Sequence, residues 1–417
     1  MEKKNKGLVV AIIILVVISL GLGGYICYEK GLFNKFLNKE TPTTDTTDTT
    51  KEDKYTNFKV VRNYYWNDKE DKLGEDKFYI IGYKNGEWEE IVSEDHEGTG
   101  IVFFGEYNNK IYYANNEVFK YIDLNDKSLT PVTWIKCEGT YDTAGQPGNL
   151  VHPETGFVKD GIIYFRMQTG SHKHSFRYLS VDATKFSDIK KVANIGYSFD
   201  YNLDNNAIYY MDYKEIGTPK DVVKFDMKTK EKSKIHTFDK NTTLLSGHNG
   251  ITLIAKSTKN KNKYNLYLYN LETSKETYLD EVNYTPEDDD SIWYNYYGTN
   301  RLIVDKNTIY YLDNNNVMKY ENGNKSKVYE YNTDKNKNYF EGDYLIFNEN
   351  DNNILYHRND ENDEDEYITF DGKKITESEF KETYQKYEII LKDKSKKTIY
   401  DEDGFGVEYN LNTSTPW

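Results

Sequence analysis

The stretch Ile309–Val328, IYYLDNNNVMKYENGNKSKV, decides the fold of this chain. IYYLD and VMKYE are short runs in which apolar and polar residues alternate, and a polar turn at Asn314–Asn316 separates them. Asn322-Gly323 then leads into a third run that ends at Val328. Asn-Gly between alternating apolar runs is typical of a β-hairpin. The stretch therefore predicts three short antiparallel strands.

The same unit recurs along the chain. A period near 45 residues, with about four short strands in each copy, is typical of the blades of a β-propeller. In each copy the second run is followed by a turn residue whose side chain can bond the turn backbone, namely Asp123, Asp182, Asp226, Asn270, Asn322 or Asp371. Six copies begin at Ile111 (IYYAN), Ile163 (IYFRM), Ile208 (IYYMD), Thr252 (TLIAK), Ile309 (IYYLD) and Ile354 (ILYHR).

Two sets of runs flank the six copies and can form a seventh blade. Phe58–Trp66, Phe78–Tyr83 and Glu87–Val92 precede them, and Lys386–Lys392 and Lys396–Asp401 follow them. Pairing of these C-terminal strands with the N-terminal ones would remove exposed sheet edges. We therefore predict an all-β fold, a single β-propeller of about seven four-stranded blades, with six or eight blades as alternatives. Thr376 and Glu379 form a capping-box pattern, which predicts a short helix over 376–386.

Composition agrees with this fold class and excludes one class of partner. The chain has 40 Tyr and 19 Phe, which favour strands, and only 7 Pro among 417 residues. Its formal net charge is −15, whereas binding of nucleic acid requires a basic surface. The two cysteines, Cys27 and Cys137, give no disulfide framework. Cys137 is predicted to be a small buried apolar residue.

The N-terminal segment predicts a membrane anchor. Leu8–Ile26 carries no charge and has the length needed to cross the hydrocarbon core. A cleaved signal peptide is the alternative, but Ile26 before Cys27 does not fit a lipoprotein signal. Thr41–Lys54 is polar and low in complexity, which is typical of a flexible linker. We predict a cytoplasmic N-terminus (1–7), a transmembrane helix (8–27), a juxtamembrane segment and linker (28–54), an extracytoplasmic propeller (55–412) and a tail (413–417).

The hairpins also carry a family resemblance. YLYNLETSKETYL and VVKFDMKTKEKSKI resemble hairpins of bacterial extracytoplasmic β-propellers. Together with the N-terminal anchor, the repeats resemble an uncharacterised family of membrane-anchored, propeller-like proteins from bacteria with AT-rich genomes. This resemblance covers roughly 53–411. It implies the architecture and brings no catalytic motif with it.

The least repetitive stretch is Cys137–Phe157, which interrupts the repeat with several Gly and two Pro. Long loops on a rigid scaffold often carry function, although a packing role is the alternative. We name as candidate ligand-binding residues Tyr141, Asp142, Gln146 and His152.

Two other features have a plain interpretation beside a functional one. His172-Lys173-His174 reads as a solvated turn, with a pair of metal ligands as the alternative. The acidic stretches 287–290 and 360–366 read as solvated hairpin tips, with incidental calcium binding as the alternative. We assign no metal site, no cofactor and no catalytic residue.

These features together predict a membrane-tethered module that binds a protein, peptide or glycan outside the cell. Sequence signatures of hydrolases, metalloproteases, phosphate loops and sialidases are absent from the chain. A hydrolase or lyase with carboxylates or a metal in the propeller channel is the alternative, because such groups assemble in space rather than in sequence. A scaffold for envelope complexes is a third hypothesis.

Overall fold

The computed structural model divides the chain into two compact units, Met1–Asp53 and Lys54–Trp417. All described residues belong to the second unit, so the predicted anchor and linker lie outside them. No helix within the described residues is long and apolar enough to cross a membrane. The described ranges are 54–67, 72–95, 101–137, 152–170, 173–202, 206–212, 220–248, 250–260, 263–283, 302–305, 307–313, 316–330, 343–346, 354–359, 364–369 and 371–401.

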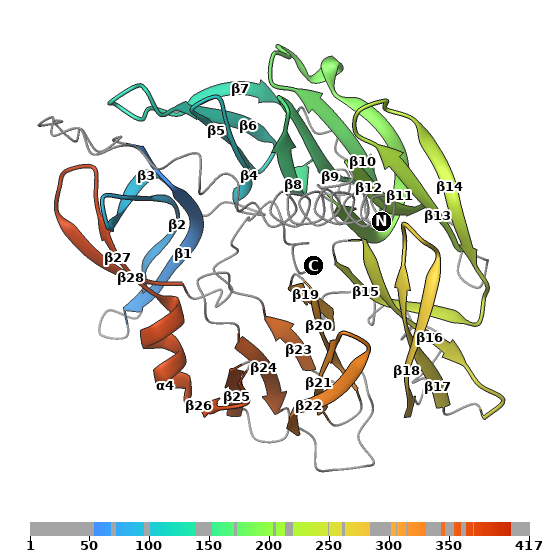
Figure 1. The fold of residues 1–417 in the computed structure, drawn as a ribbon. Helices are drawn as coiled ribbons and strands as arrows, with labels where there is room; N and C mark the ends of the chain where they lie inside the picture. The colour runs from blue at the N-terminus through green and yellow to red at the C-terminus, as the bar shows by residue number, and fades with distance from the viewer. Residues whose placement is uncertain are drawn as a thin grey trace, which may run out of the picture. The chain divides into compact units, whose positions relative to one another are not determined.

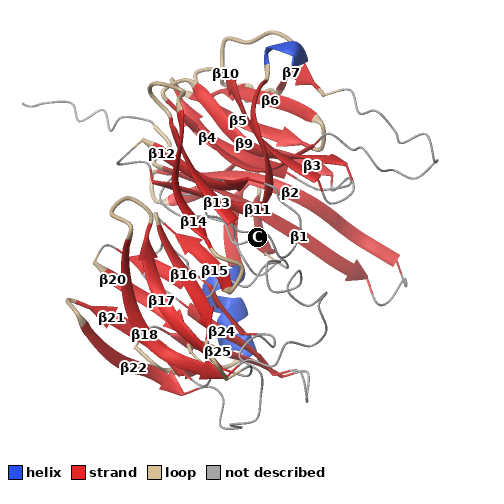
Figure 2. Cartoon of the chain, turned by 90° about the vertical axis from the view of Figure 1, so that its right-hand side faces the viewer, coloured by secondary structure: helices blue, strands red, loops and turns tan. Residues whose placement is uncertain are grey.

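The described chain is mostly β-strand, arranged in mainly antiparallel sheets, most of which follow one another along the sequence (Figures 1 and 2). Four sheets have four strands each, joined in sequence order. They are β4 (Ile101–Tyr107), β5 (Lys110–Asn115), β6 (Val118–Asp123) and β7 (Val132–Lys136); β15 (Thr242–His248), β16 (Ile251–Ser257), β17 (Lys263–Asn270) and β18 (Lys275–Asn283); β19 (Leu302–Asp305), β20 (Thr308–Leu312), β21 (Asn316–Glu321) and β22 (Asn324–Glu330); and β23 (Asp343–Ile346), β24 (Ile354–Asn359), β25 (Glu364–Thr369) and β26 (Lys374–Ile375).

Each of the six predicted copies is a hairpin formed by two consecutive strands of one sheet, so the repeat is confirmed. The deciding stretch forms β20, β21 and β22. Asn322 and Gly323 form the predicted turn, with φ of 50° and 83°. Side chains of turn residues bond the backbone as expected in several copies. The Asp226 carboxylate, for example, accepts hydrogen bonds from the backbone N–H groups of Lys228 and Thr229.

The largest sheet contains two four-stranded units that share one long strand. β11 pairs with β10 through its first half and with β12 through its second half, and the register shifts between Ile195 and Phe199. Sequence patterns did not predict this sharing. The strands are β8 (His152–Lys159), β9 (Ile162–Gly170), β10 (Lys173–Ser180), β11 (Lys190–Asn202), β12 (Ala207–Asp212), β13 (Lys220–Asp226) and β14 (Lys232–Phe238), with the 3-10 turn η1 (Phe186–Asp188) before β11.

The five runs predicted near the two ends of the chain form one sheet, as expected, so this sheet has five strands where most other sheets have four. We call it the terminal sheet; it consists of β1 (Asn57–Asn67), β2 (Lys72–Lys84), β3 (Glu87–Asp95), β27 (Lys386–Ile390) and β28 (Lys396–Tyr400). β27 runs parallel to β3, and an isolated bridge joins Asn63 to Asp401. The helix α4 (Glu377–Phe380) has the predicted Thr376–Glu379 capping box, and the π-turn η2 (Lys381–Gln385) leads from it into β27.

Neighbouring sheets pack face to face, and this explains the alternation within the repeats. Successive residues of a strand point to opposite faces. In β5, Ile111 and Tyr113 join an apolar cluster with the terminal sheet, whereas Tyr112 and Ala114 join a cluster with β8 and β9. The first strands of neighbouring sheets also lie against one another, as for β4 with β8 and β15 with β19. The described domain is therefore propeller-like in its strand order and packing.

Polar contacts also join neighbouring sheets. Glu94 at the end of β3 accepts hydrogen bonds from the Tyr113 hydroxyl (2.7 Å) and from the Lys120 ammonium (2.7 Å), both on the next sheet. Burial by itself raises the pKa of Glu94, but the hydrogen bonds from Lys120, Tyr113 and Asn115 outweigh it and hold the pKa below its usual range. The ionised carboxylate therefore stabilises the interface.

We expect Glu94→Gln to lower the free energy of unfolding by about 1–3 kcal/mol at pH 7, because it removes a charged acceptor from partly buried donors. A carboxylate with a lowered pKa in the folded state adds stability above its unfolded pKa, and that stability is lost as the pH falls. The difference between wild type and Glu94→Gln should therefore shrink below about pH 4.5, the ordinary pKa of the group. Urea unfolding at pH 7 and pH 4 measures this difference. Glu281→Gln, at an exposed ion pair with Lys263, serves as the control and should change little.

Candidate functional site

The four predicted ligand-binding residues lie in or beside the connection between β7 and β8. Tyr141, Asp142 and Gln146 fall within 138–151, outside the described residues. His152 is the first residue of β8, where its backbone pairs with Gln168 of β9. The structure therefore describes the strands from which this connection begins and ends, and the four residues remain a prediction.

A cluster of ionisable side chains lies beside the point where this connection enters β8. The register of β8 shifts between Pro153 and Thr155, which makes Glu154 a bulge residue. Bulges often redirect a side chain near functional sites. Glu154 Oε2 lies 2.6 Å from Arg166 Nε and 2.8 Å from His174 Nδ1, so one carboxylate oxygen holds both groups. We call Glu154, Arg166 and His174 the charged triad.

Strand pairing explains why the triad forms at this end of the sheet. The start of β8, the end of β9 and the start of β10 lie side by side, because His152 pairs with Gln168 and Gln168 pairs with His174. The side chain of His174 is only 6% exposed. A carboxylate can only accept, so Nδ1 of His174 carries the proton in this hydrogen bond. The arrangement fixes the orientation of a buried imidazole.

The position of His174 corrects one prediction. His172-Lys173-His174 was expected to be a solvated turn, but Lys173 and His174 belong to β10 and His174 is buried. The side chain of His174 contacts a carboxylate, whereas His172 lies outside the described residues. Among the described residues, no group of three His, Cys, Asp or Glu side chains could hold a metal ion.

The opposite face of the same hairpin carries a second partly buried arginine. Arg177 donates from Nε to the hydroxyl of Ser175, at 2.8 Å, and Ser175 is fully buried. Burial lowers the pKa of Arg177, and the neighbouring Cys137 partly offsets this effect. Cys137 is fully buried, as predicted, and burial raises the pKa of its thiol to about 12. A thiol with this pKa stays protonated at neutral pH and is a poor nucleophile.

One sequence signal could have pointed to this sheet. The chain contains five arginines among its 54 basic residues, and two of the five, Arg166 and Arg177, lie in the hairpin β9–β10. Three of its seven histidines, at 152, 172 and 174, lie in or beside the same strands. Lysine supplies positive charge almost everywhere else. Because arginine offers a planar, fork-shaped donor that lysine lacks, its concentration here indicates a specific geometric role.

Comparison with known proteins gives a fold similarity and no family. No protein-family model and no curated protein matches the chain. Among solved structures, an oligogalacturonate lyase from Vibrio parahaemolyticus is similar, with 11% identity, a TM-score of 0.41, and coverage of 75% of this chain and 92% of the other. The β-propeller domain of the trilobed protease from Pyrococcus furiosus is 12% identical, with a TM-score of 0.36 and coverage of 58% and 76%.

A puromycin hydrolase is 8% identical with a TM-score of 0.45, and the similarity covers 78% of this chain and 52% of the hydrolase. These TM-scores all lie below 0.5. The description of the fold therefore rests on the strands and their pairing in this chain.

We expect Glu154→Gln to lower the free energy of unfolding by about 1–3 kcal/mol, because it removes the charge that holds two largely buried donors. Urea unfolding at pH 7 measures the loss. Glu231→Gln, on an exposed turn, provides a matched control and should stay within about 0.5 kcal/mol of wild type. Equal effects of the two substitutions would show that the triad has no particular role in stability.

Proposed function

We propose that the chain is a membrane-tethered binding protein, and that its propeller-like domain closes into a seven-bladed ring outside the cell. The leading apolar segment 8–27 supplies the anchor, and the Thr-rich linker separates it from the domain. A protein, peptide or glycan binds at the end of β8, β9 and β10, where the connection 138–151 joins the sheet. The blade count rests on counting the seven-stranded sheet as two blades and the terminal sheet as one.

The charged triad is the observation that carries this proposal. Glu154, Arg166 and His174 are held together, largely out of solvent, at the end of the sheet where the connection 138–151 enters β8. Lysine supplies the cation in most ion pairs of the described residues, whereas this site uses an arginine, whose planar donor group lysine lacks. A preorganised polar group at the base of a long connection is a common basis of specific recognition.

The test is retention of a ligand by the full-length protein. Immobilised wild type is incubated with solubilised cell-envelope material, and the retained molecules are compared by mass spectrometry with those retained by variants. We expect two variants to retain at least tenfold less of the specific ligand than wild type does. They are Arg166→Lys and the double variant that combines Tyr141→Ala with Asp142→Ala. Tenfold corresponds to about 1.4 kcal/mol of binding free energy.

Lys185→Ala provides the matched control, because Lys185 is exposed beside η1, at the opposite end of β10. It should retain the ligand as wild type does. Equal retention by all variants would refute the site, and no specific ligand on wild type would refute the binding function.

A second candidate function is a hydrolase or lyase, and one contact favours it. The hydrogen bond of 2.8 Å from His174 to Glu154 orients the imidazole, as a general base requires. Incubation of the full-length protein with acidic and neutral polysaccharides, followed by size analysis, tests this function. Cleavage by wild type that is lost in His174→Gln would support an enzyme, and intact polymers would support the binding protein.

A further inference from the structure

We propose that the hairpin β27–β28 is an electrostatic latch, which holds the C-terminal strands on the N-terminal strands and releases them when salt screens its ion pairs. This inference is independent of the proposed ligand site. It concerns the terminal sheet, where the two ends of the domain meet.

Charge separates the two sides of this joint. The segment 386–400 has five lysines and two acidic residues, a net charge of +3 in a chain whose net charge is −15. The strand β3 that it joins has five acidic residues and no basic residue, a net charge of −5. Opposite charges on the two sides favour association over a distance of about 10 Å at 0.1 M salt.

The backbone contributes little to this joint. Parallel pairing between β27 and β3 covers two residue pairs, Ile389 with Trp88 and Ile390 with Glu89. The isolated bridge between Asn63 and Asp401 adds one further pair on the other side. β1 and β2, by contrast, pair along their whole length. Side chains must therefore supply most of the attachment.

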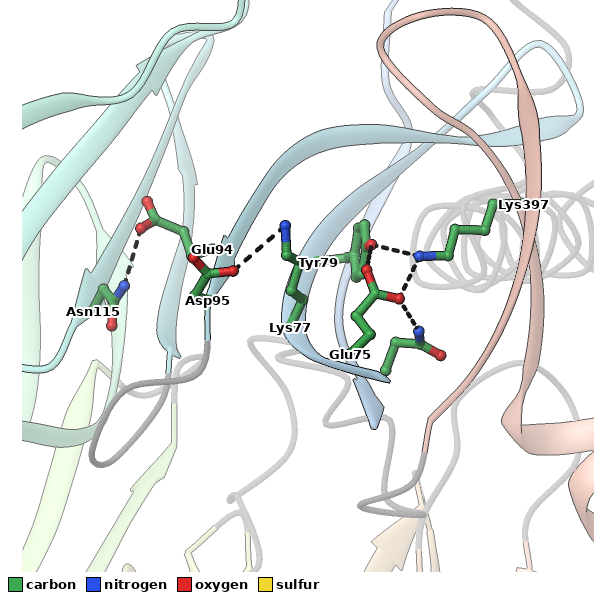
Figure 3. A network of polar contacts seen from close by, with 8 residues as sticks. Glu75, Lys77, Tyr79, Glu94, Asp95, Asn115 and Lys397 are labelled. Carbon is green, nitrogen blue, oxygen red and sulfur yellow. Dashed lines mark hydrogen bonds and ion pairs between the residues drawn. The ribbon is translucent and has the colours of Figure 1, made fainter. Parts of the chain in front are cut away.

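Lysines of the hairpin supply ion pairs to the N-terminal strands. Lys396 Nζ lies 2.7 Å from Glu87 Oε1, at the exposed rim of the joint. Lys397 Nζ lies 2.5 Å from Glu75 Oε2 and donates to the Tyr79 hydroxyl at 2.9 Å (Figure 3). The backbone N–H of Lys392 donates to Glu90 Oε2 at 3.2 Å. Each of these contacts joins segments about 300 residues apart.

The Lys397–Glu75 pair belongs to a network inside the terminal sheet. Glu75 also accepts hydrogen bonds from Tyr79, at 2.8 Å, and from Asn63, at 2.5 Å. Burial raises the pKa of Glu75, but its bonds to Lys397, Tyr79 and Asn63 outweigh this and leave the pKa below its usual range. An ionised carboxylate with three donors is stabilising as long as the donors stay in place.

Buried polar side chains concentrate in and beside the terminal sheet. Four of the ten buried polar side chains among the described residues lie here: Lys59, Asn63, Gln385 and Asp401. Lys59 is fully buried, with its Nζ 5.6 Å from the ring centre of Trp88 and 5.3 Å from that of Tyr387. The apolar cluster of the terminal sheet consists of Val61, Tyr79, Ile81, Tyr387, Ile389 and Ile399.

Hydrogen exchange on the full-length protein in 50 mM and 500 mM NaCl tests the latch. We expect amides of 386–400 to exchange about three- to tenfold faster at high salt, because several partly exposed ion pairs weaken together. Amides of β16 and β17, two strands that pair with one another without a register shift, should show no such change. A uniform response of all peptides, or none at 386–400, would overturn the proposal.

Charge-swap variants supply a second readout that does not depend on salt. Lys396→Glu should speed exchange of 386–400 at low salt, and adding Glu87→Lys should restore it, because both residues are exposed and tolerate substitution. Lys263→Glu, which breaks an exposed pair with Glu281 in another sheet, is the matched control. Failure of the double variant to restore slow exchange would show that shape, and not charge, holds the hairpin.

Discussion

The domain depends on one constraint: a four-stranded antiparallel sheet of this composition is apolar on both faces and must be covered on both. The IYY runs show that both faces of a sheet are covered. In β20, Ile309 and Tyr311 pack in a cluster with β16 and β17, whereas Leu312 packs in a cluster with β23 and β25. Each sheet therefore needs a neighbour on either side. A row of such sheets has two uncovered ends unless its first and last members meet.

Strands from both ends of the domain combine in the terminal sheet. One of its faces packs on β4 and β5 through Val60, Ile80 and Phe103. Such a joint brings together segments more than 300 residues apart, and so carries a large loss of conformational entropy. It is also the place where polar and charged side chains concentrate. Charges that pair in one register only can select the correct strand partner, because a wrong register leaves them buried without a counter-charge.

Much of the fold could be predicted because its signals are local. Alternation in IYYLD, the Asn322-Gly323 turn and the Thr376–Glu379 capping box are each set by residues a few positions apart, and each is confirmed. The sharing of β11 could not be predicted, because which strand pairs with each half of a 13-residue strand depends on distant partners. The triad escaped because Glu154 and His174 meet only through a bulge and two strand pairings.

Charge acts in two different ways on the two polar regions of the domain. In the triad, one carboxylate holds an arginine and a histidine of the same sheet, so the group is local and keeps its geometry as long as β8, β9 and β10 stay paired. At the joint, the partners belong to segments that separate completely if the hairpin leaves, so the same kind of interaction controls association. Because the chain is acidic, its net charge opposes compaction. A cationic hairpin placed against the most acidic strand reverses that repulsion at the one sheet where both ends of the domain must stay together.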